Sequence, residues 1–369
     1  MVNVEQQLVD VLERFQIVGE YRGYELIESG HINVTYKIYF FRHGELKDYI
    51  LQKVNTYVFK NPKAVMKNIA AVTEYIRAKI KSTGISAKRF VLHYQPAVDG
   101  NYYTVMPDGG FWRCCRFIDD SVSFMSCETE KIAEESGKAF GEFQMYLADY
   151  PVKDLEIVIP HFHNTIHRYN VFKTAIEQNL AGRKASVEAE IEGYLALEEI
   201  ATRLYRMQRN GELPLRVTHN DTKTSNVLFD SNDFRHLSVI DLDTVMPGLV
   251  AFDFGDAIRV VGNTGEEDER DLANVNVAMD KYEAFTRGFV GKVSSLLTET
   301  EKRTLALGAV AMTLECGVRF LSDYLDGDKY FRVHYEDQNL VRAKCHLHLA
   351  KKMIERLDEM QAIVDKYCK

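Results

Sequence analysis

The sequence has no run of apolar residues long enough to cross a bilayer, and residues 1–15 lack the basic start and apolar core of a signal peptide. Cysteine is sparse, with six residues scattered over 369 positions and none in the paired spacing of a zinc site. The sequence also shows no internal repeat and no low-complexity tract. These absences predict a cytoplasmic protein with reduced thiols, no membrane contact and no zinc centre.

Acidic residues also outnumber basic ones, with 54 aspartate and glutamate residues against 46 lysine and arginine residues. The formal net charge is −8, whereas nucleic acids and anionic membranes require a basic face on their protein partners. We therefore expect no nucleic-acid partner, and a bound anion would have to be met locally by a metal ion and a few cations. Hydrophobic residues at 46% and charged residues at 27% are ordinary for a globular protein with a sizeable core.

A short stretch beyond the middle of the chain has the spacing of a kinase catalytic loop. Asp221 is followed, after four intervening residues, by Asn226, and in kinases this aspartate takes the proton of the attacking hydroxyl while the asparagine binds Mg²⁺. Two short apolar runs at 227–229 and 237–240 predict a hairpin. Asp241 follows the hairpin directly, so we expect it to return beside Asn226 and share one Mg²⁺ with it.

These residue types suit phosphoryl transfer, in which the protein mainly positions the acceptor hydroxyl and neutralises charge on the γ-phosphate. Asp221 is the predicted general base, and Lys223 would place a cation near the transferred group. Asn226 and Asp241 are the predicted metal ligands, with Asp243 supporting the metal shell. The segment therefore predicts a kinase active site that uses ATP and Mg²⁺.

These aspartates allow two other interpretations. An Asx-type turn at Asn220 and Asp221, followed by a solvated Asp241, would explain each residue singly, but the joint pattern is much rarer and favours catalysis. A triplet that begins at Asp253 spells the Asp-Phe-Gly magnesium motif of protein kinases. Because Asp253 lies a further segment beyond the hairpin, we predict that it braces the catalytic loop as a structural acid.

The segments before the catalytic loop predict a small β-rich lobe. Short stretches rich in β-branched and aromatic residues alternate with turn-like residues, as in an antiparallel sheet. The expected strands span residues 24–27, 34–40, 48–54, 90–94 and 102–105. Pro62 is well placed in a first helical turn, and apolar residues at helical spacing continue from it to Ile80.

Beyond residue 116 the pattern becomes mainly helical, interrupted only by the hairpin. The expected helices span residues 129–147, 163–180, 187–208, 279–291, 299–324 and 340–366. We therefore predict an α+β class, bilobal protein-kinase-like fold. A small antiparallel β-sheet N-lobe with one main helix would occupy residues 1–115, and a larger, mostly α-helical C-lobe would occupy residues 116–369. The cleft between such lobes is where a small ligand binds.

The chain resembles the aminoglycoside phosphotransferase and choline kinase family, and within it is most similar to the bacterial N-acetylhexosamine 1-kinases. The resemblance covers nearly the whole length and is carried by residues 30–36, 49–52, 161–168, 216–226, 240–247, 252–259 and 315–320. It implies ATP- and Mg²⁺-dependent phosphorylation of the anomeric hydroxyl of N-acetylglucosamine or N-acetylgalactosamine to the sugar 1-phosphate. This hemiacetal hydroxyl is more acidic than an ordinary alcohol, which suits a carboxylate base.

The predicted nucleotide site departs from general kinase patterns at two positions. The loop after the first strand has a single glycine, Gly30, where a phosphate-covering loop usually has three. Gln52 occupies the position of the usual strand lysine. We predict that Gln52 hydrogen-bonds a phosphate and that Asn68, on the following helix, replaces its usual glutamate partner.

The hinge and the acceptor site complete the predicted cleft. The backbone of Arg116, Phe117 and Ile118 is expected to line the adenine edge, with the Phe117 ring touching the base. The resemblance to the hexosamine kinases suggests that His31 and Asn33 face the sugar.

Arg319 is the predicted main sugar contact, with Tyr324 next along the same helix. The alternative for Arg319 is an exposed ion pair with Glu315, one helical turn away. His163 and His167 are also one turn apart, but without an acidic base between them we expect helix packing rather than metal binding.

The fold alone does not determine the acceptor. Another sugar, choline or homoserine remains an alternative, although choline would require an aromatic or acidic cage that the sequence does not reveal. A nucleotide-binding regulator without catalysis is a second alternative, because of the sparse glycines and Gln52, but the retained Asp221, Asn226 and Asp241 argue against it. We expect a monomer that binds ATP and a small-molecule sugar substrate.

Overall fold

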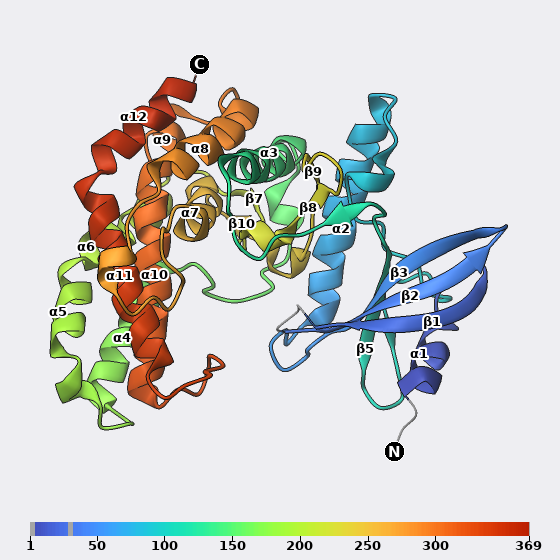
Figure 1. Cartoon of the computed structure of the whole chain (residues 1–369), viewed down its shortest axis with the longest axis horizontal. Coiled ribbons are helices and arrows are strands. Elements are labelled where there is room, and N and C mark those ends of the chain that lie inside the picture. Colours follow the sequence, from blue (N-terminus) through green and yellow to red (C-terminus); the bar gives the residue numbers. More distant parts are fainter. Residues whose placement is uncertain (1–3, 29–31, 369) are drawn as a thin grey trace.

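A five-stranded antiparallel sheet forms the smaller lobe of the computed structural model, which describes residues 4–28 and 32–368 (Figure 1). The strand order is β1-β2-β3-β5-β4. The strands are β1 (Glu20–Ile27), β2 (Val34–Arg42), β3 (Glu45–Lys53), β4 (Thr104–Val105) and β5 (Phe111–Arg116). Side chains alternate between the two faces of each strand. Ile38 and Phe40 pack beneath helix α1 (Val4–Leu12), so Thr35 and Lys37 lie on the opposite face.

Helix α2 (Pro62–Ser82) stands between the sheet and the larger lobe (Figure 1). It starts at Pro62, where the side chain of Asn61 accepts a hydrogen bond from the Ala64 amide and caps the helix. Its apolar face packs in one continuous core with Phe143 and Val217 of the larger lobe. The helix is therefore part of the interface between the lobes.

The larger lobe is built mainly of helices around the buried helix α10 (Leu305–Asp326). Its other helices are α3 (Glu130–Tyr146), α4 (Thr165–Gln178), α5 (Glu188–Ala196), α6 (Glu198–Arg209), α7 (Val250–Val261), α8 (Met279–Val293), α9 (Glu299–Lys302), α11 (Gln338–Glu355) and α12 (Leu357–Tyr367). Gly255 and Gly308 lie where α7 crosses α10, and a Cβ on Gly255 would come within 2.1 Å of the Gly308 carbonyl oxygen. Only glycine permits this approach.

Within the described residues, α10 is the one helix long and apolar enough to span a membrane. Of its apolar window, 89% is buried inside the protein. Packing in the core accounts for the apolar composition of this helix.

Two small sheets bracket the segment between residues 216 and 248. Strands β8 (Val227–Asp230) and β9 (His236–Val239) form the predicted hairpin, with β6 (Ser121–Val122) added at the edge of β8. Strand β7 (Arg216–Thr218) pairs with β10 (Met246–Gly248). The loops after β7 and β9 therefore meet in the same region.

The bilobal α+β fold is confirmed, but several predicted elements are corrected. Residues 90–94 form no strand; only Tyr94 makes an isolated bridge to Cys115. The predicted helices 187–208, 299–324 and 340–366 each divide in two, and α7 was not predicted. The breaks fall near Leu197, Thr304 and Arg356, without glycine or proline. Packing against neighbouring helices, rather than local propensity, sets these ends.

Candidate functional site

The loop after β7 is fixed at Asn220, a residue in the left-handed region with φ 65°. Asparagine tolerates this conformation better than most residues. The side-chain amide of Asn220 donates to the backbone carbonyl of Thr244 at 2.9 Å. The backbone carbonyl oxygen of Asn220 lies 3.1 Å from Nε2 of His163. The strained residue is thus held on several sides, which aims the following Asp221.

Asp253 braces this loop from α7, as predicted. Its carboxylate accepts hydrogen bonds from the amides of His219 at 2.9 Å and Asn220 at 2.7 Å, and from Nε2 of Gln144 at 2.6 Å. Asp253 is buried, and burial raises the pKa of its carboxyl group although these donors oppose the shift. All its neighbours belong to the loop or its support, so Asp253 is a structural acid.

Asp221, Lys223 and Asn226 form one group. Nδ2 of Asn226 donates to the Asp221 carbonyl at 2.8 Å and to Asp221 Oδ2 at 2.9 Å. Nζ of Lys223 lies 3.1 Å from the same carboxylate oxygen. Burial lowers the pKa of Lys223, but the carboxylates of Asp221 and Asp241 outweigh it and the pKa is raised, so Lys223 keeps its charge.

Asp241 returns to this group through the β8–β9 hairpin. Val227 pairs with Val239, and the Ile240 amide donates to the Asn226 carbonyl at 2.9 Å. Asp241 itself adopts the left-handed conformation with φ 59°. The hairpin register therefore carries Asp241 to the catalytic loop.

The Asp241 side chain is exposed to solvent, but the protein packed around it still limits the hydration of its carboxylate. Burial, and then the charges of Asp243 and Asp221, raise its pKa to about 6. It forms no hydrogen bond or ion pair with the described residues. An acidic, uncompensated oxygen donor of this kind fits a divalent cation.

Asp243 points elsewhere, into the contact between the lobes. It is buried, and both of its carboxylate oxygens accept hydrogen bonds from the Arg113 guanidinium on β5. Nδ2 of Asn33 donates to Asp243 Oδ2 at 2.8 Å. The oxygens of Asp243 are therefore engaged by Arg113 and Asn33 of the smaller lobe.

The predicted pairing of Gln52 with Asn68 is wrong. Gln52 Nε2 donates to Thr35 Oγ1 at 3.0 Å, and its Oε1 accepts from Nε of Arg113 at 2.9 Å. Asn68 is buried, and its Nδ2 donates to the carbonyls of Glu156 and Val245, both at 2.8 Å. These backbone groups of the larger lobe engage Asn68, which ties α2 to that lobe.

The next residue to consider is Asn33, which together with His31 was predicted to face the sugar. Asn33 is engaged by Asp243 through Nδ2, and its Oδ1 accepts from the Asn55 amide at 2.9 Å. These bonds fix the β1–β2 connection rather than leave Asn33 free for a ligand. His31 lies outside the described residues.

The hinge between the lobes has limited free hydrogen-bonding capacity. The amide of Arg116 donates to the His93 carbonyl at 2.8 Å, and the amide of Phe117 donates to the Asp48 carbonyl at 3.0 Å. The Ile118 amide donates to no carbonyl of the described residues, so the predicted contact with the adenine edge stays a prediction. Lys37 covers the Phe117 ring, with Nζ 4.0 Å from the ring centroid.

Arg319 lies among aromatic rings at the predicted acceptor side. Its guanidinium carbon is 5.9 Å from the ring centroid of Phe162, 5.9 Å from that of Tyr330 and 5.4 Å from that of Phe331. It forms no ion pair with the described residues. The alternative of an exposed Glu315–Arg319 pair is wrong, because Glu315 is buried and contacts His163 Nδ1 at 3.1 Å.

Tyr324, the second predicted acceptor residue, is buried and packs beneath Arg183, whose guanidinium carbon lies 4.5 Å from its ring centroid. Tyr330 occupies the expected place beside Arg319 and is 71% exposed. Asp323 anchors its loop by accepting hydrogen bonds from the amides of residues 329–331 at 2.8 to 2.9 Å. No periodic pattern in the sequence pointed to this loop residue.

A recess of about 200 Å³ adjoins the catalytic loop. Phe162, His163 and Asn220 line it, together with Tyr205 and Gln208 of α6. Phe162 is shared with the aromatic group around Arg319. The recess therefore lies between the catalytic-loop residue Asn220 and the aromatic group around Arg319.

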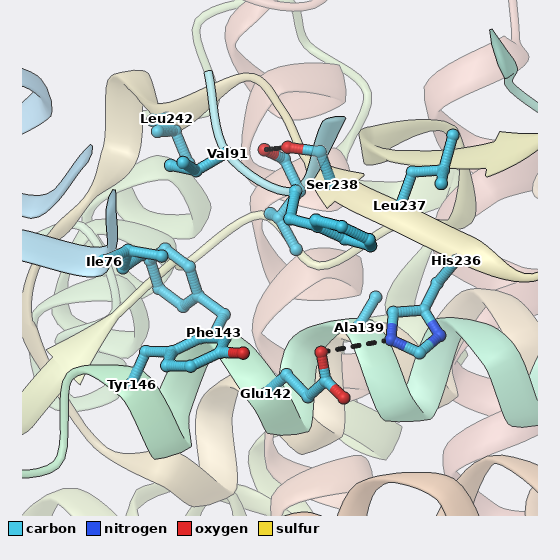
Figure 2. A pocket seen from close by; sticks show the side chains of 12 residues that line it. Ile76, Val91, Ala139, Glu142, Phe143, Tyr146, His236, Leu237, Ser238 and Leu242 are labelled. Carbon is cyan, nitrogen blue, oxygen red and sulfur yellow. Dashed lines mark hydrogen bonds and ion pairs between the residues drawn. The ribbon is translucent and has the colours of Figure 1, made fainter. Parts of the chain in front are cut away.

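A much smaller hollow of about 30 Å³ lies behind the hairpin, between α2 and α3 (Figure 2). Glu142 and His236 face each other across one end of it, with His236 Nε2 3.2 Å from the Glu142 carboxylate (Figure 2). Apolar residues such as Ile76 and Phe143 form the rest of its wall. Its size suits a water molecule rather than a substrate.

Glu267, Cys316 and His346 bring potential metal-binding atoms within 4.8 Å of one another. However, the Glu267 carboxylate already pairs with two guanidinium groups, at 3.5 Å from Arg259 and 3.3 Å from Arg342. These charges oppose a cation at the same place. We assign no metal to this cluster.

Comparisons with known proteins agree with the arrangement of lobes and loops. The family model described as "Phosphotransferase enzyme family" (APH) matches residues 24–285. The fold is similar to an aminoglycoside phosphotransferase from Alicyclobacillus acidocaldarius, with a TM-score of 0.61, 11% identity and coverage of 97% of this chain and 96% of that chain.

Two other solved structures share the fold. A microcompartment-associated aminopropanol kinase gives a TM-score of 0.60 at 13% identity, covering 97% of this chain and 99% of that chain. A choline kinase from Cryptosporidium parvum gives a TM-score of 0.57 at 13% identity, covering 98% of this chain and 99% of that chain. At these sequence identities the similarity to solved structures shows the fold alone. The family model, in contrast, matches residues 24–285 and so covers most of the chain. The chain belongs to the phosphotransferase enzyme family of the aminoglycoside phosphotransferase type.

Proposed function

We propose that the protein is an ATP- and Mg²⁺-dependent kinase that phosphorylates the anomeric hydroxyl of an N-acetylhexosamine. The observation that carries the kinase assignment is that Asn226 binds Asp221 directly, while the hairpin brings Asp241 close enough for the charge of Asp221 to raise its pKa. A general base, an amide oxygen and an acid are the parts that phosphoryl transfer requires of a protein.

The residues fit a magnesium ion. Because Nδ2 of Asn226 points at Asp221, its amide oxygen is left without a hydrogen bond to the described residues. Asn226 and Asp241 would hold the ion, which would neutralise charge on the phosphate oxygens. Asp243 is engaged by Arg113 and Asn33, so we assign it a supporting role.

Asp221 would accept the proton of the acceptor hydroxyl. Its free oxygen, Oδ1, has no hydrogen bond to the described residues, whereas Oδ2 is held by Asn226 and Lys223. This leaves one oxygen in a fixed orientation for the substrate, as general-base catalysis requires. Lys223 would stabilise the negative charge that builds on the transferred group.

The surroundings of Arg319 favour a neutral sugar over choline. Aromatic rings can bind a quaternary ammonium, but here the Arg319 guanidinium already lies among the rings of Phe162, Tyr330 and Phe331. Its positive charge would repel a second cation. The N–H groups of Arg319 can instead donate to hydroxyl or acetamide oxygens, and the exposed Tyr330 offers a face for a sugar ring.

Release of ADP across a panel of acceptors tests the proposal. We expect turnover with N-acetylglucosamine or N-acetylgalactosamine, a sugar 1-phosphate as product, and no comparable turnover with choline, homoserine or an aminoglycoside. Asp221→Asn is the control that should abolish the signal. Preferential turnover of an amino alcohol would overturn the acceptor assignment, and absence of turnover despite Mg²⁺·ATP binding would favour a regulator.

A further inference from the structure

Arg113 is an almost fully buried cation at the centre of the apolar strand β5, with 2% of its surface exposed. Every nitrogen of its guanidinium is used in hydrogen bonds: Nε donates to Gln52 Oε1 at 2.9 Å, and Nη1 and Nη2 donate to the two oxygens of Asp243. Burial opposes this charge, but Asp243 outweighs it and the pKa of Arg113 is raised. Arg113 therefore remains charged beneath the sheet.

The position of Arg113 relative to Gln52 is set by strand register. The two residues are direct partners in the antiparallel β3–β5 pair, so their side chains lie on the same face of the sheet. Gln52 occupies the position where kinases usually carry a strand lysine. The guanidinium of Arg113 therefore fills the space next to the position at which that cation is absent.

We propose that Arg113, which lies on strand β5 beside the position where strand β3 lacks its usual cation, positions the metal-binding turn through Asp243. This inference rests on the kinase assignment and is independent of the acceptor. Arg113 is a positioning residue: it does not have to touch the nucleotide, because its partner Asp243 belongs to the 3₁₀ turn Leu242–Thr244 that follows Asp241 directly.

The partners of Arg113 explain why a buried pair is retained at this place. Asp243 would be a buried, unpaired carboxylate without Arg113, next to the uncompensated Asp241. Asn33 adds a donor from the β1–β2 connection, so two parts of the smaller lobe hold one carboxylate of the larger lobe. The bidentate geometry fixes orientation as well as charge, which a lysine at the same place would not do.

The test measures Mg²⁺·ATP binding by thermal shift and, separately, steady-state kinetics. Arg113→Met should weaken Mg²⁺·ATP binding at least tenfold and lower kcat, and Arg113→Lys should be intermediate. The matched control is Arg287→Met, which removes an arginine that pairs with Glu134 between α8 and α3; it should bind and turn over as the unmodified protein does.

Rescue from the neighbouring strand separates positioning from general stability. In the Arg113→Met background, Gln52→Lys should restore most of the lost Mg²⁺·ATP affinity, because a lysine at position 52 would extend from β3 on the same face. Arg113→Met with Asp243→Asn removes both buried charges and should fold even where the single variant does not, yet still bind Mg²⁺·ATP weakly.

The outcomes distinguish this inference from the proposed function. If the unmodified protein does not bind Mg²⁺·ATP, both fail. If it binds, and the folded Arg113→Met or double variant binds equally well, the positioning role of Arg113 is overturned while the kinase assignment stands. A failure of Gln52→Lys to restore binding in a folded background also overturns it.

Discussion

Asn226 donates from one nitrogen to both the carbonyl and the carboxylate of Asp221, at 2.8 and 2.9 Å. The same contact orients two residues with different roles. It leaves the amide oxygen of Asn226 without a hydrogen bond to the described residues, and it fixes Asp221 Oδ2 while Oδ1 stays free. The proposed base and the proposed metal ligand are therefore oriented by one side-chain contact.

Asp221→Asn should lower kcat by about 10²–10⁴-fold, the usual range for a lost general base. The Michaelis constants should change little, because the substituted amide retains the size of the carboxylate. ADP release measured with the best acceptor checks this prediction, with circular dichroism to establish that the variant is folded. Undiminished kcat would remove Asp221 from the mechanism.

Asp241→Asn should abolish activity and yet stabilise the ligand-free protein above pH 6. The pKa of Asp241 in the folded protein is about 6, above the value of about 3.9 expected in the unfolded chain. The folded state is therefore favoured by protonation of Asp241, and this contribution is present below about pH 3.9 and lost as the pH rises through 6.

Melting temperatures with and without Mg²⁺ measure this effect. At pH 8 without Mg²⁺ the variant should melt above the unmodified protein, by about 2–4 °C for each ~1 kcal/mol of relieved repulsion, and the difference should shrink toward pH 4. Mg²⁺·ATP should stabilise the unmodified protein selectively. A lower melting temperature of the variant at pH 8 without ligand would contradict the raised pKa.

How far the sequence predicts this site depends on how far apart its residues are in the chain. Asp221, Asn226 and Asp241 lie in one continuous segment, so spacing and a two-stranded hairpin were sufficient to bring them together. The bracing role of Asp253 was predictable for a different reason, because it lies too far beyond the hairpin to share a metal ion with Asn226. Arg113 contacts Asp243, which lies 130 residues further along the chain, and no local sequence pattern predicts such a pair. The one signal in the sequence is that an arginine stands between Trp112 and Cys114 in an otherwise apolar strand, where a charged side chain requires a buried partner.

The errors have a similar cause. Asn68 was assigned to Gln52 by analogy of position, but the carbonyl groups that engage it belong to residues 156 and 245. Tyr324 was expected beside Arg319 because it comes next along the same helix, whereas the residue beside Arg319 is Tyr330, in a loop that Asp323 anchors through backbone amides. Periodicity predicts which residues share a helix face but does not predict what a loop places over that face.

Glu315→Gln should shift the alkaline limb of the activity profile to lower pH. Both ring nitrogens of His163 face acceptors, Glu315 Oε1 and the Asn220 carbonyl, each at 3.1 Å, so the doubly protonated ring satisfies both. Burial lowers the pKa of His163, but Glu315 outweighs it and the pKa is raised. The support that the charged ring gives to the catalytic loop is present at low pH and lost as the pH rises through the raised pKa.

Kcat measured from pH 5 to 10 tests the role of His163. Glu315→Gln removes the charge that raises the His163 pKa, so the decline in kcat should begin at lower pH than in the unmodified protein. His163→Gln should remove this limb and lower kcat at every pH. Superimposable profiles for the Glu315 variant and the unmodified protein would exclude the histidine as a support of the loop.

Arg319→Met should raise the Michaelis constant for the acceptor about tenfold or more, since a charged hydrogen bond contributes roughly 1.5–3 kcal/mol, and should leave that for ATP nearly unchanged. Arg319 belongs to α10 of the larger lobe, and its guanidinium lies among the rings of Phe162, Tyr330 and Phe331, whereas the predicted adenine contact is at Ile118. Tyr330→Ala should have a smaller effect in the same direction, because it removes a stacking face and no charge.

Arg342→Met is the matched control, since its guanidinium also lies over an aromatic ring, that of Phe320, but pairs with Glu267. Equal changes in both Michaelis constants for Arg319→Met would mean that this residue shapes the lobe as a whole, and the acceptor would have to bind elsewhere.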